Sequence, residues 1–360
     1  MTGQQECSYD VVVVGGGAAG LAGAQALARA RRSVLVVDAG HGRNAAAGQV
    51  HNYLGREGTP PGELVAIGRA EVSGYGGQIL AGDVTGAERL DGPDGGFRVH
   101  VADGSAVLAR RLLVTTGLVD ELPDVPGVAE RGGREVLHCP YCHGWEVRDQ
   151  ALGVLATGPM GVHQALMWRQ WSADVTLFLH TASELTDEQT EQISARGIKV
   201  VTGEVVALEV AGDRLAGVRL ASGQLVPRQA VVVAPRFVAR AGLLADLGLR
   251  PVEQEMGGAV LGSFVPSDPT GATAVDGVWV AGNVTDLRAQ VISSAAAGLN
   301  AAAGINADLT SQDTRWAVAA VRDRRARVGG TAEVFSPQSE REVCERVLGD
   351  RRHGLQQTRP

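Results

Sequence analysis

The segment that most constrains the fold of this chain lies near its N-terminus and reads YDVVVVGGGAAGLAGAQALARA. A β-branched run ends in glycines, an Ala- and Leu-rich stretch follows, and SVLVVDAG adds a second apolar run that ends in an acid. Continuous apolar strands that alternate with helices are typical of a parallel sheet covered by helices. Residues 10–38 therefore predict a β-α-β unit and an α/β fold class.

The loop between this strand and this helix matches G-x-G-x-x-G and consists of Gly15, Gly16, Gly17, Ala18, Ala19 and Gly20. The first glycine permits the tight turn, the second lets a pyrophosphate approach the backbone, and the third lets the helix pack closely on the strand. The helix N-terminus offers its free N–H groups to the phosphates. Asp38 ends the next strand, at the spacing of a carboxylate that binds ribose. A glycine-rich turn without a ligand is the weaker alternative, because strand, helix and acid are all in place.

A second strand–helix–strand pattern occurs in ALGVLATGP, MGVHQALMWRQWS and DVTLFLH. In its loop Ala156 stands where the first glycine belongs, and the bulky Pro159 and Met160 enter the turn. No acid ends the following strand, and no arginine follows it to hold a 2′-phosphate. We interpret this unit as a nucleotide fold whose nicotinamide site has decayed, while weak binding of NADPH remains open.

Strand and hairpin patterns follow each of these two units. GQILAGDVTGAERL and FRVHVADGSAVLARRLLVTTG come after the first, and KVVTGEVVALEV and GVRLASGQLVPRQAVVVAP come after the second. The 360 residues allow two domains of ordinary size, and the repeated organisation predicts two similar ones. Near the end, GVWVAGNVTD predicts a buried strand and AQVISSAAAGLNAAAGINADL a helix of small residues. After Thr310 the charged sequence predicts a tail with one or two short helices.

Composition and charge argue against several classes of protein. The net charge of −7 argues against a nucleic-acid partner. The apolar stretch from Val11 to Ala30 lacks a basic start and is broken by glycines, so it predicts neither a signal peptide nor a membrane span. We therefore expect a cytoplasmic protein without a membrane partner. Four cysteines in a chain of this length do not indicate a secreted disulfide scaffold, and Cys7 and Cys344 are interpreted as unrelated thiols.

Two of the four cysteines lie close together in HCPYCHGWE, where Cys139 and Cys142 are spaced C-x-x-C. This spacing occurs in zinc sites, in covalent haem attachment and in dithiol–disulfide exchange. A structural zinc site needs four ligands and no second C-x-x-C exists, so no metal is predicted. Haem attachment matches C-x-x-C-H literally, but it also needs a distal ligand and usually export. A redox-active pair is the favoured interpretation.

The residues around the pair favour thiol chemistry. A helix that starts at C-x-x-C lowers the pKa of the thiol, and Pro140 suits the first turn of such a helix. His143 follows the second cysteine and is a candidate acid–base catalyst near neutral pH. Glu146, three residues further on, is a candidate catalytic residue that orients His143. The alternative for both is that they are ordinary residues on a helix surface.

These features together resemble the low-molecular-weight thioredoxin reductases, over about residues 8–310. AGQVHNYLG is similar to the family's segment beside the flavin, LLVTTG to its crossover, and VWVAGNVTDLRAQVISSAAAGLNAAAGI to its C-terminal flavin segment. The resemblance implies two Rossmann-like, three-layer ββα nucleotide-binding domains, FAD as cofactor and a homodimer. With Gly15, Gly17, Ala18, Ala19, Gly20 and Asp38, the cofactor-binding candidates then include Gln49, Thr116, Gly117, Gly282, Asn283, Gln290 and Val291.

The same resemblance implies a division of the chain into domains. Residues 1–118 and 246–310 form an FAD-binding domain, and residues 119–245 form a degenerate NAD(P)H-like domain that carries the cysteine pair. Residues 311–360 form a charged C-terminal tail.

The chain departs from the family pattern at three places. Asn283 stands where the family usually has aspartate, so this contact to the flavin is neutral here. His143 replaces the aspartate that follows the second cysteine and serves the family as proton donor. Thr181 and Ala182 replace the basic pair that holds the NADPH phosphate.

CPYCHGWE with a weakened nicotinamide site is similar to a subgroup, the FAD-dependent dithiol oxidases of disulfide natural products such as gliotoxin and holomycin. The resemblance implies that a substrate thiolate attacks Cys139, that a second substrate thiol closes the product disulfide, and that Cys142 reduces FAD. Oxygen then accepts the electrons and gives peroxide, so the implied partners are a small-molecule dithiol and O2. Tyr141, Trp145 and His51 are candidate walls of the substrate pocket. An NADPH-dependent thioredoxin reductase and a non-catalytic, redox-sensing flavoprotein remain as alternatives.

Overall fold

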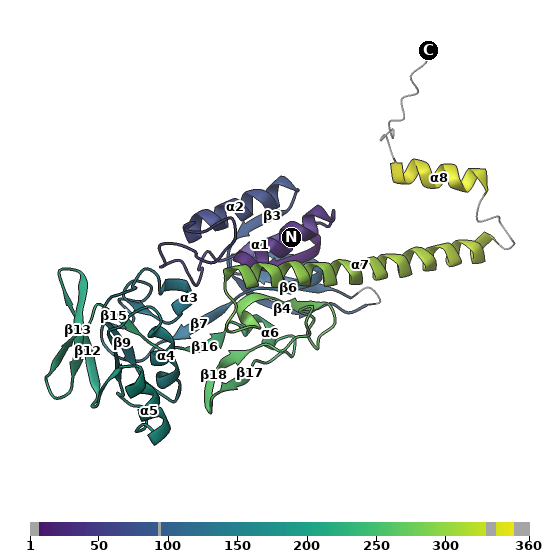
Figure 1. Ribbon diagram of the computed structural model, residues 1–360. Helices are drawn as coiled ribbons and strands as arrows, with labels where there is room; N and C mark the ends of the chain where they lie inside the picture. The colour runs from purple at the N-terminus through teal and green to yellow at the C-terminus, as the bar shows by residue number, and fades with distance from the viewer. Residues whose placement is uncertain (1–6, 93–94, 329–335, 349–360) are drawn as a thin grey trace, which may run out of the picture. The chain divides into compact units, whose positions relative to one another are not determined.

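The structure is a computed structural model that describes residues 7–92, 95–328 and 336–348. The chain divides into two compact units, Met1–Asn306 and Ala307–Pro360. The sheets and the predicted site residues lie in the first unit, where Figure 1 shows a group of elements around β6 and a second group around β9.

The first sheet has the strand order β3-β2-β1-β6-β5-β4, with β19 beside β6. Its strands are β1 (Ser8–Val14), β2 (Val34–Asp38), β3 (Gln78–Ala81), β4 (Val84–Arg89), β5 (Phe97–Val101), β6 (Ala106–Val114) and β19 (Val278–Val280). The pairs β1·β2, β2·β3, β1·β6 and β6·β19 are parallel, whereas β4·β5 and β5·β6 are antiparallel. The sheet is therefore assembled from two stretches that lie far apart in the sequence.

The helices that accompany this sheet are α1 (Ala18–Arg29), α2 (Pro61–Gly74) and α7 (Val291–Val328). α1 and the first turns of α7 pack at backbone distance. A Cβ on Gly298 would lie 1.9 Å from the backbone oxygen of Ala19, and a Cβ on Gly23 would lie 3.0 Å from the backbone oxygen of Gly298. The small residues predicted for this helix are therefore what lets it approach α1.

The second sheet is parallel, with the strand order β11-β10-β9-β15-β8. Its strands are β8 (Val136–Leu137), β9 (Leu152–Leu155), β10 (Val175–Phe178), β11 (Lys199–Val201) and β15 (Ala230–Val232). Two helices accompany it, α4 (Met160–Trp168) and α5 (Asp187–Ala195), together with an antiparallel sheet of β12 (Val205–Ala211), β13 (Arg214–Leu220) and β14 (Leu225–Pro227).

Neighbouring residues of the second sheet enter different cores. Leu177 belongs to one apolar cluster with Trp168 of α4, while Phe178 belongs to another with Leu208 of β12. Because successive side chains of a strand point to opposite faces, helices cover one face and the antiparallel sheet covers the other. This is the three-layer ββα arrangement that was predicted, and the α/β fold class is confirmed.

A four-stranded sheet of order β17-β18-β16-β7 lies at the junction of the two groups. It contains β7 (Leu118–Glu121), β16 (Arg236–Ala239), β17 (Val252–Met256) and β18 (Ala259–Phe264), and the short helix α6 (Gly242–Ala245) follows β16. β7 leads from β6 toward the second sheet, and β16 pairs with it antiparallel on the way back. The predicted domain limits fall at this sheet and stay a prediction.

Several elements differ from the sequence predictions. α7 does not end near Thr310 but continues to Val328, because Ala and Arg favour helix and neither Gly nor Pro interrupts residues 310–328. α8 (Pro337–Leu348) is a short helix of the predicted tail, the rest of which partly lies outside the described residues. The helix at the cysteine pair, α3 (Pro140–His143), is a single turn. Within the described part of the chain, no helix is both long and apolar enough to cross a membrane.

Candidate active site

The glycine loop joins β1 to α1 and packs tightly against the end of β6. Gly15 has a φ of +104°, and a Cβ there would lie 2.6 Å from the backbone oxygen of Thr115. A Cβ on Gly20 would lie 1.9 Å from the backbone oxygen of Gly15, so only glycine allows α1 this close to the loop. Thr115, which the sequence analysis missed, places its Oγ1 at 2.8 Å from the same oxygen of Gly15 and holds the turn.

The side of the loop where a pyrophosphate would lie is open. A Cβ on Gly17 would meet no atom within 4 Å. The N-terminus of α1, which begins with Ala18 and Ala19, has no side-chain cap, so its N–H groups are available to an anion. The residues present therefore fit the diphosphate of a dinucleotide.

Asp38 ends β2 and turns toward the glycine loop. Its Oδ1 accepts the N–H of Gly16 at 3.0 Å, and its Oδ2 accepts a hydrogen bond from the Arg69 guanidinium of α2. Burial by itself raises the pKa of this carboxyl, but the hydrogen bonds from Gly16 and Arg69 outweigh it, so the pKa lies below its ordinary value. The carboxylate is ionised at neutral pH and can accept ribose hydroxyls, and Arg69 is a neighbouring contact that the sequence did not reveal.

Thr116 and Gly117 follow β6 directly. The Oγ1 of Thr116 donates to the backbone oxygen of Arg240 at 2.6 Å, so this hydroxyl is bonded to the segment after β16. Gly117 has a φ of +70°, and open space surrounds the position of a Cβ. Of the two candidates, Gly117 is the one that leaves room for a ligand.

The other predicted flavin contacts lie at loops and helix starts. Gln49 is exposed in the loop after β2. Gln290 and Val291 stand at the beginning of α7, where the N–H of Ser294 donates to the backbone oxygen of Gln290 at 2.8 Å. The predicted helix start at these residues is therefore present.

Gly282 and Asn283 begin the 3-10 turn η1 (Gly282–Val284) after β19. The Nδ2 of Asn283 donates to the backbone oxygens of Asp286 and Ala289 at 2.9 and 3.0 Å, and its Oδ1 accepts from Arg43 at 3.2 Å. An amide satisfies all three partners, whereas a carboxylate cannot donate to two carbonyl oxygens. The surroundings are therefore matched to asparagine, at a position where the resemblance described above implies an aspartate.

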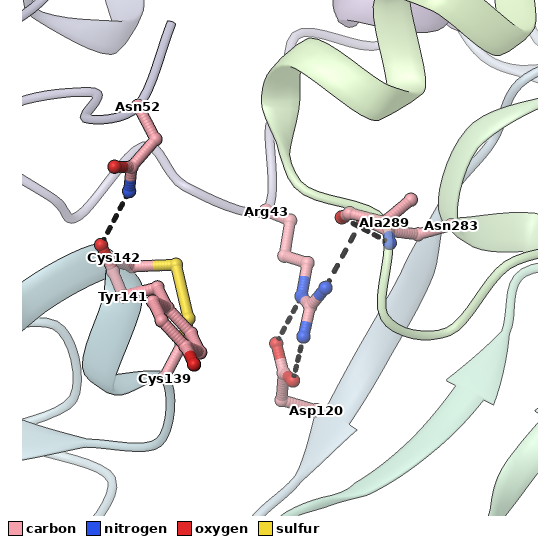
Figure 2. Close-up of a disulfide and its surroundings, with 8 residues drawn as sticks. All are labelled: Arg43, Asn52, Asp120, Cys139, Tyr141, Cys142, Asn283 and Ala289. Atoms are coloured by element: carbon pink, nitrogen blue, oxygen red, sulfur yellow. Dashed lines mark hydrogen bonds and ion pairs between the residues drawn. A yellow bond between two sulfur atoms is a disulfide. The ribbon is translucent and has the colours of Figure 1, made fainter.

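Arg43 is a second residue that the sequence analysis missed. Figure 2 shows it between Asn283 and Asp120 of β7, to whose carboxylate its Nε and Nη2 donate at 2.8 and 2.7 Å. The guanidinium also lies 5.0 Å from the ring centroid of Phe237 on β16. A bidentate pair of this kind fixes both side chains, so Arg43 ties the loop after β2 to the connecting strands.

The cysteine pair lies where β8 ends. Cys139 and Cys142 form a disulfide with their Cα atoms 5.3 Å apart, and Cys139 is the N-cap residue of α3 with Pro140 directly after it. The described residues contain no group of three or more His, Cys, Asp or Glu able to hold a metal ion. The chemistry available at this place is thiol–disulfide exchange.

The length of α3 corrects one argument made from the sequence. The turn has only four residues, and Gly144 closes it by donating its N–H to the backbone oxygen of Pro140 at 2.7 Å. A single turn has few aligned peptide dipoles, so it stabilises a thiolate less than a helix of several turns would. Side chains near the pair must therefore supply the acid–base chemistry.

His143 ends α3 and is partly buried. Burial lowers its pKa, the charge of Glu146 raises it and that of His51 lowers it, and the result lies below the ordinary value. The imidazole is therefore neutral at neutral pH and is able to take a proton from a thiol.

Glu146 lies beyond α3 and contacts His51, a residue of the loop after β2. The Oε1 of Glu146 is 3.4 Å from Nε2 of His51, and Nδ1 of His51 is 2.6 Å from Oε1 of Glu57. Next to it, the Nδ2 of Asn52 donates to the backbone oxygen of Tyr141 at 2.6 Å, as Figure 2 shows. His51, predicted as a pocket wall, is thus held between two carboxylates.

Tyr141 and Trp145, the other predicted walls, stand on either side of Cys142 in the sequence and are 61% and 65% exposed. The ring of Tyr141 packs edge-on against Trp171 at 5.7 Å, and the guanidinium of Arg148 lies 4.1 Å from the ring centroid of Trp145. Exposed aromatic rings beside a disulfide suit an apolar or aromatic substrate.

The second nucleotide loop differs from the first in its packing. Pro159 is the N-cap residue of α4, and a Cβ on Gly161 would lie 2.4 Å from the Cβ of Ala156. His180, which follows β10 closely, has a φ of +44°, and its Nδ1 accepts the N–H of Val205 at 3.0 Å. Burial lowers the pKa of His180, so a neutral ring that is bonded to the backbone occupies the region where an acid would bind ribose.

Most of the functional residues that the sequence analysis missed act through contacts between distant segments. Arg43 and Asp120 are 77 residues apart, and Asn52 and Tyr141 are 89 residues apart. No local pattern signals such pairs. Thr115 is different, because it stands beside the threonine and glycine that were singled out.

A glycine loop between parallel strands of one sheet and a disulfide beside a second, parallel sheet define a nucleotide-dependent disulfide oxidoreductase with two nucleotide-binding domains. The sequence profile of the family described as pyridine nucleotide-disulphide oxidoreductase matches residues 9–302, and the chain belongs to this family of flavin-binding oxidoreductases. The resemblance to thioredoxin reductase-like enzymes is confirmed.

Three similar proteins cover most of the chain. Thioredoxin reductase tcpT of Claviceps purpurea is 32% identical over 84% of this chain and 96% of its own length. Thioredoxin reductase sirT of Leptosphaeria maculans is 28% identical over 83% of this chain and 93% of its own. The crystal structure of HlmI is 46% identical and superimposes with a TM-score of 0.81 over 92% of this chain and 99% of its own.

Proposed function

We propose that the protein is an FAD-dependent dithiol oxidase that closes an intramolecular disulfide in a small molecule and uses O2 as electron acceptor. The residues proposed to hold FAD are Gly15, Gly17, Ala18, Ala19, Gly20, Asp38, Gln49, Thr116, Gly117, Gly282, Asn283, Gln290 and Val291. FAD, when bound, supplies a two-electron acceptor that O2 reoxidises with formation of H2O2.

The catalytic steps assigned to the chain's own residues are two thiol exchanges. His143 takes the proton of a first substrate thiol, and the thiolate attacks Cys139, which breaks its bond to Cys142. A second substrate thiolate then attacks the substrate sulfur of the mixed disulfide, so that the cyclic product leaves and Cys139 is released. The substrate loses two protons and two electrons, and the electrons reside on the cysteine pair until they pass to the flavin.

One observation favours a dithiol oxidase over a reductase that uses NADPH. The second nucleotide loop has Ala156 where the first has Gly15, the bulky Pro159 enters its turn, and His180 stands where a ribose-binding acid would. Without a carboxylate or a basic pair, this site lacks the groups that recognise either form of the nicotinamide cofactor. Electrons are therefore proposed to enter from the dithiol.

An NADPH-dependent thioredoxin reductase is the second candidate, because the relatives tcpT and sirT are both named thioredoxin reductases. The two candidates differ in the source of electrons. A dithiol oxidase takes them from its substrate and needs no nicotinamide nucleotide, whereas the reductase delivers them from NADPH to a disulfide.

An anaerobic titration of the flavin-loaded protein, followed at the flavin absorption band, tests the proposal. Dithiothreitol is expected to bleach the band and NADPH to leave it unchanged. In air, one peroxide is expected for each dithiol oxidised. Cys142→Ser is expected to abolish bleaching, and Cys344→Ser, which changes an exposed free thiol, is the matched control. Rapid bleaching by NADPH contradicts the proposal and supports the reductase.

We also propose a homodimer in the cytoplasm. A surface hollow of about 550 Å³ lies between α1 and the start of α7, and its lining includes the exposed side chains of Ile292 and Leu299. A second copy of the chain would cover these apolar groups. The exposed free thiols of Cys7 and Cys344 are consistent with a reducing compartment.

A further inference from the structure

A loop of residues 50–59, named here the histidine loop, carries an imidazole to the cysteine pair. Its first and last residues pair as an isolated antiparallel bridge. Asn52 has a φ of +59°, which is a conformation that asparagine tolerates better than most residues. Its side chain donates to the backbone oxygen of Tyr141 at 2.6 Å and fastens the loop to α3. His51 is therefore fixed beside the disulfide by the residue that follows it.

The imidazole of His51 lies between two exposed carboxylates. Nδ1 is 2.6 Å from Glu57 and Nε2 is 3.4 Å from Glu146. The side chain of His51 is only 16% exposed, whereas that of Glu57 is 65% exposed. The side chain of Glu146 is 40% exposed, so both carboxylates reach water and the imidazole between them is largely shielded from it.

The hydrogen bonds of Glu57 fix the orientation of the His51 ring. Its Oε2 accepts the backbone N–H of Asn52 at 2.8 Å, and its Oε1 faces Nδ1. A carboxylate only accepts, so Nδ1 donates to Glu57. Nε2 donates toward Glu146 when that carboxyl is ionised and can accept its proton once Glu146 has taken one up. A proton that reaches Glu146 therefore has an acceptor next to it.

The proposed reaction needs such an acceptor. Each turnover removes protons from two substrate thiols, but His143 is one base and takes one proton at a time. It must lose the first proton before it can accept the second. His143 is partly buried, and the charges of both Glu146 and His51 act on it.

We propose that His51, with Glu146 and Glu57, is the proton relay that returns His143 to its neutral form between the two thiol exchanges. The proposal rests on the dithiol chemistry proposed above. The S–H bond of the first thiol breaks and its proton passes by way of His143 and Glu146 to Nε2 of His51, while the Nδ1 proton leaves through Glu57 to water. The substrate sulfur meanwhile bonds to Cys139, and the electron pair of the broken disulfide stays on Cys142.

His51→Ala tests this assignment, with dithiothreitol as the dithiol. The first exchange still occurs, but the second is expected to slow about tenfold, because only water and buffer then discharge His143. The mixed disulfide between dithiothreitol and Cys139 should accumulate in acid-quenched samples, where mass spectrometry detects it without reference to the flavin. Free imidazole is expected to restore the rate in His51→Ala and not to accelerate the wild type.

Two further variants separate the relay from a general effect on folding. His41→Ala makes the same change at an exposed histidine and is expected to match the wild type. Glu57→Gln keeps the imidazole but removes the carboxylate that orients it, and it should show a smaller accumulation of the same intermediate. If neither His51→Ala nor Glu57→Gln accumulates the mixed disulfide and imidazole has no effect, the relay is wrong.

These measurements distinguish an error in the proposed relay from an error in the proposed function. The mixed disulfide reports only on exchange at the protein disulfide, whereas peroxide formation and flavin bleaching report on the later path of the electrons. A wild type that exchanges with dithiothreitol but yields no peroxide contradicts the oxidase and leaves the result on His51 standing.

Discussion

At the scale of single residues, the groups around His143 decide the pH at which the site works. Its pKa is lowered by burial and by His51 and raised by Glu146. As a base it acts only when neutral, so the acid limb of disulfide reduction by dithiothreitol should lie below the ordinary imidazole pKa of about 6.5. Glu146→Gln removes the charge that raises the pKa, so this limb should move further down.

The measurement is the rate of the first thiol exchange between about pH 4.5 and pH 8 in wild type and Glu146→Gln. The first exchange is chosen because it precedes any need to discharge His143. Glu184→Gln, a carboxylate change outside this site, is the matched control. An acid limb that moves upward in Glu146→Gln would show that Glu146 does not act on His143 as the structure indicates.

The same scale shows what the sequence could and could not predict. The glycine loop, Asp38 and the cysteine pair were recognisable because each depends on residues close in sequence. The pairing of Arg43 with Asp120 and the contact of His51 with Glu146 were not recognisable, because these partners lie far away in the sequence. His51 was predicted as a pocket wall, and only the contacts to Glu57 and Glu146 indicate an acid–base role.

At the scale of elements, close contact between α1 and α7 depends on glycine. A Cβ on Gly298 would lie 1.9 Å from the backbone oxygen of Ala19, which no side-chain rotation can relieve. Gly298→Ala must therefore separate the two helices, and we expect the free energy of unfolding to fall by about 1–3 kcal/mol. Urea denaturation of the two proteins measures the difference.

Gly62→Ala is the matched control, because Gly62 is also helical and a Cβ there meets no atom within 4 Å. Alanine is the better helix former, so this variant should be as stable as the wild type or up to about 1 kcal/mol more stable. Equal stability of Gly298→Ala and the wild type would contradict the packing described for α1 and α7.

Elements were predicted well where they repeat a long apolar pattern and poorly elsewhere. β1, α1 and β2 agree with the β-α-β unit expected from the sequence. The connecting strands β7 and β16 were missed, because four residues with charged members carry no clear alternation. The length of α3 was also not predictable, since it is set by Gly144 packing on Pro140 and Trp171.

At the scale of the whole first unit, His138 lies at the joint between the two nucleotide-binding parts, where the connecting strands run. Its ring packs edge-on against Phe237 of β16 at 6.0 Å. Burial lowers its pKa to about 4, Arg43 and His143 lower it as well, and Asp120 raises it. These neighbours belong to the loop after β2, to α3 and to β7. Protonation of His138 therefore changes its electrostatic interaction with all three segments.

This pKa makes the stability of the joint depend on pH. The unfolded chain binds a proton at His138 near pH 6.5, whereas the folded chain does so only near pH 4. Between these values the unfolded state holds more protons, so the contribution of His138 to stability is complete above about pH 6.5 and is lost as the pH falls toward 4. His138→Gln removes this titration and should flatten the dependence. Urea midpoints at about pH 7.5 and pH 5 measure it, with His163→Gln on the exposed face of α4 as control. If the variant loses as much stability on acidification as the wild type, His138 is not the neutral, half-buried group at this joint.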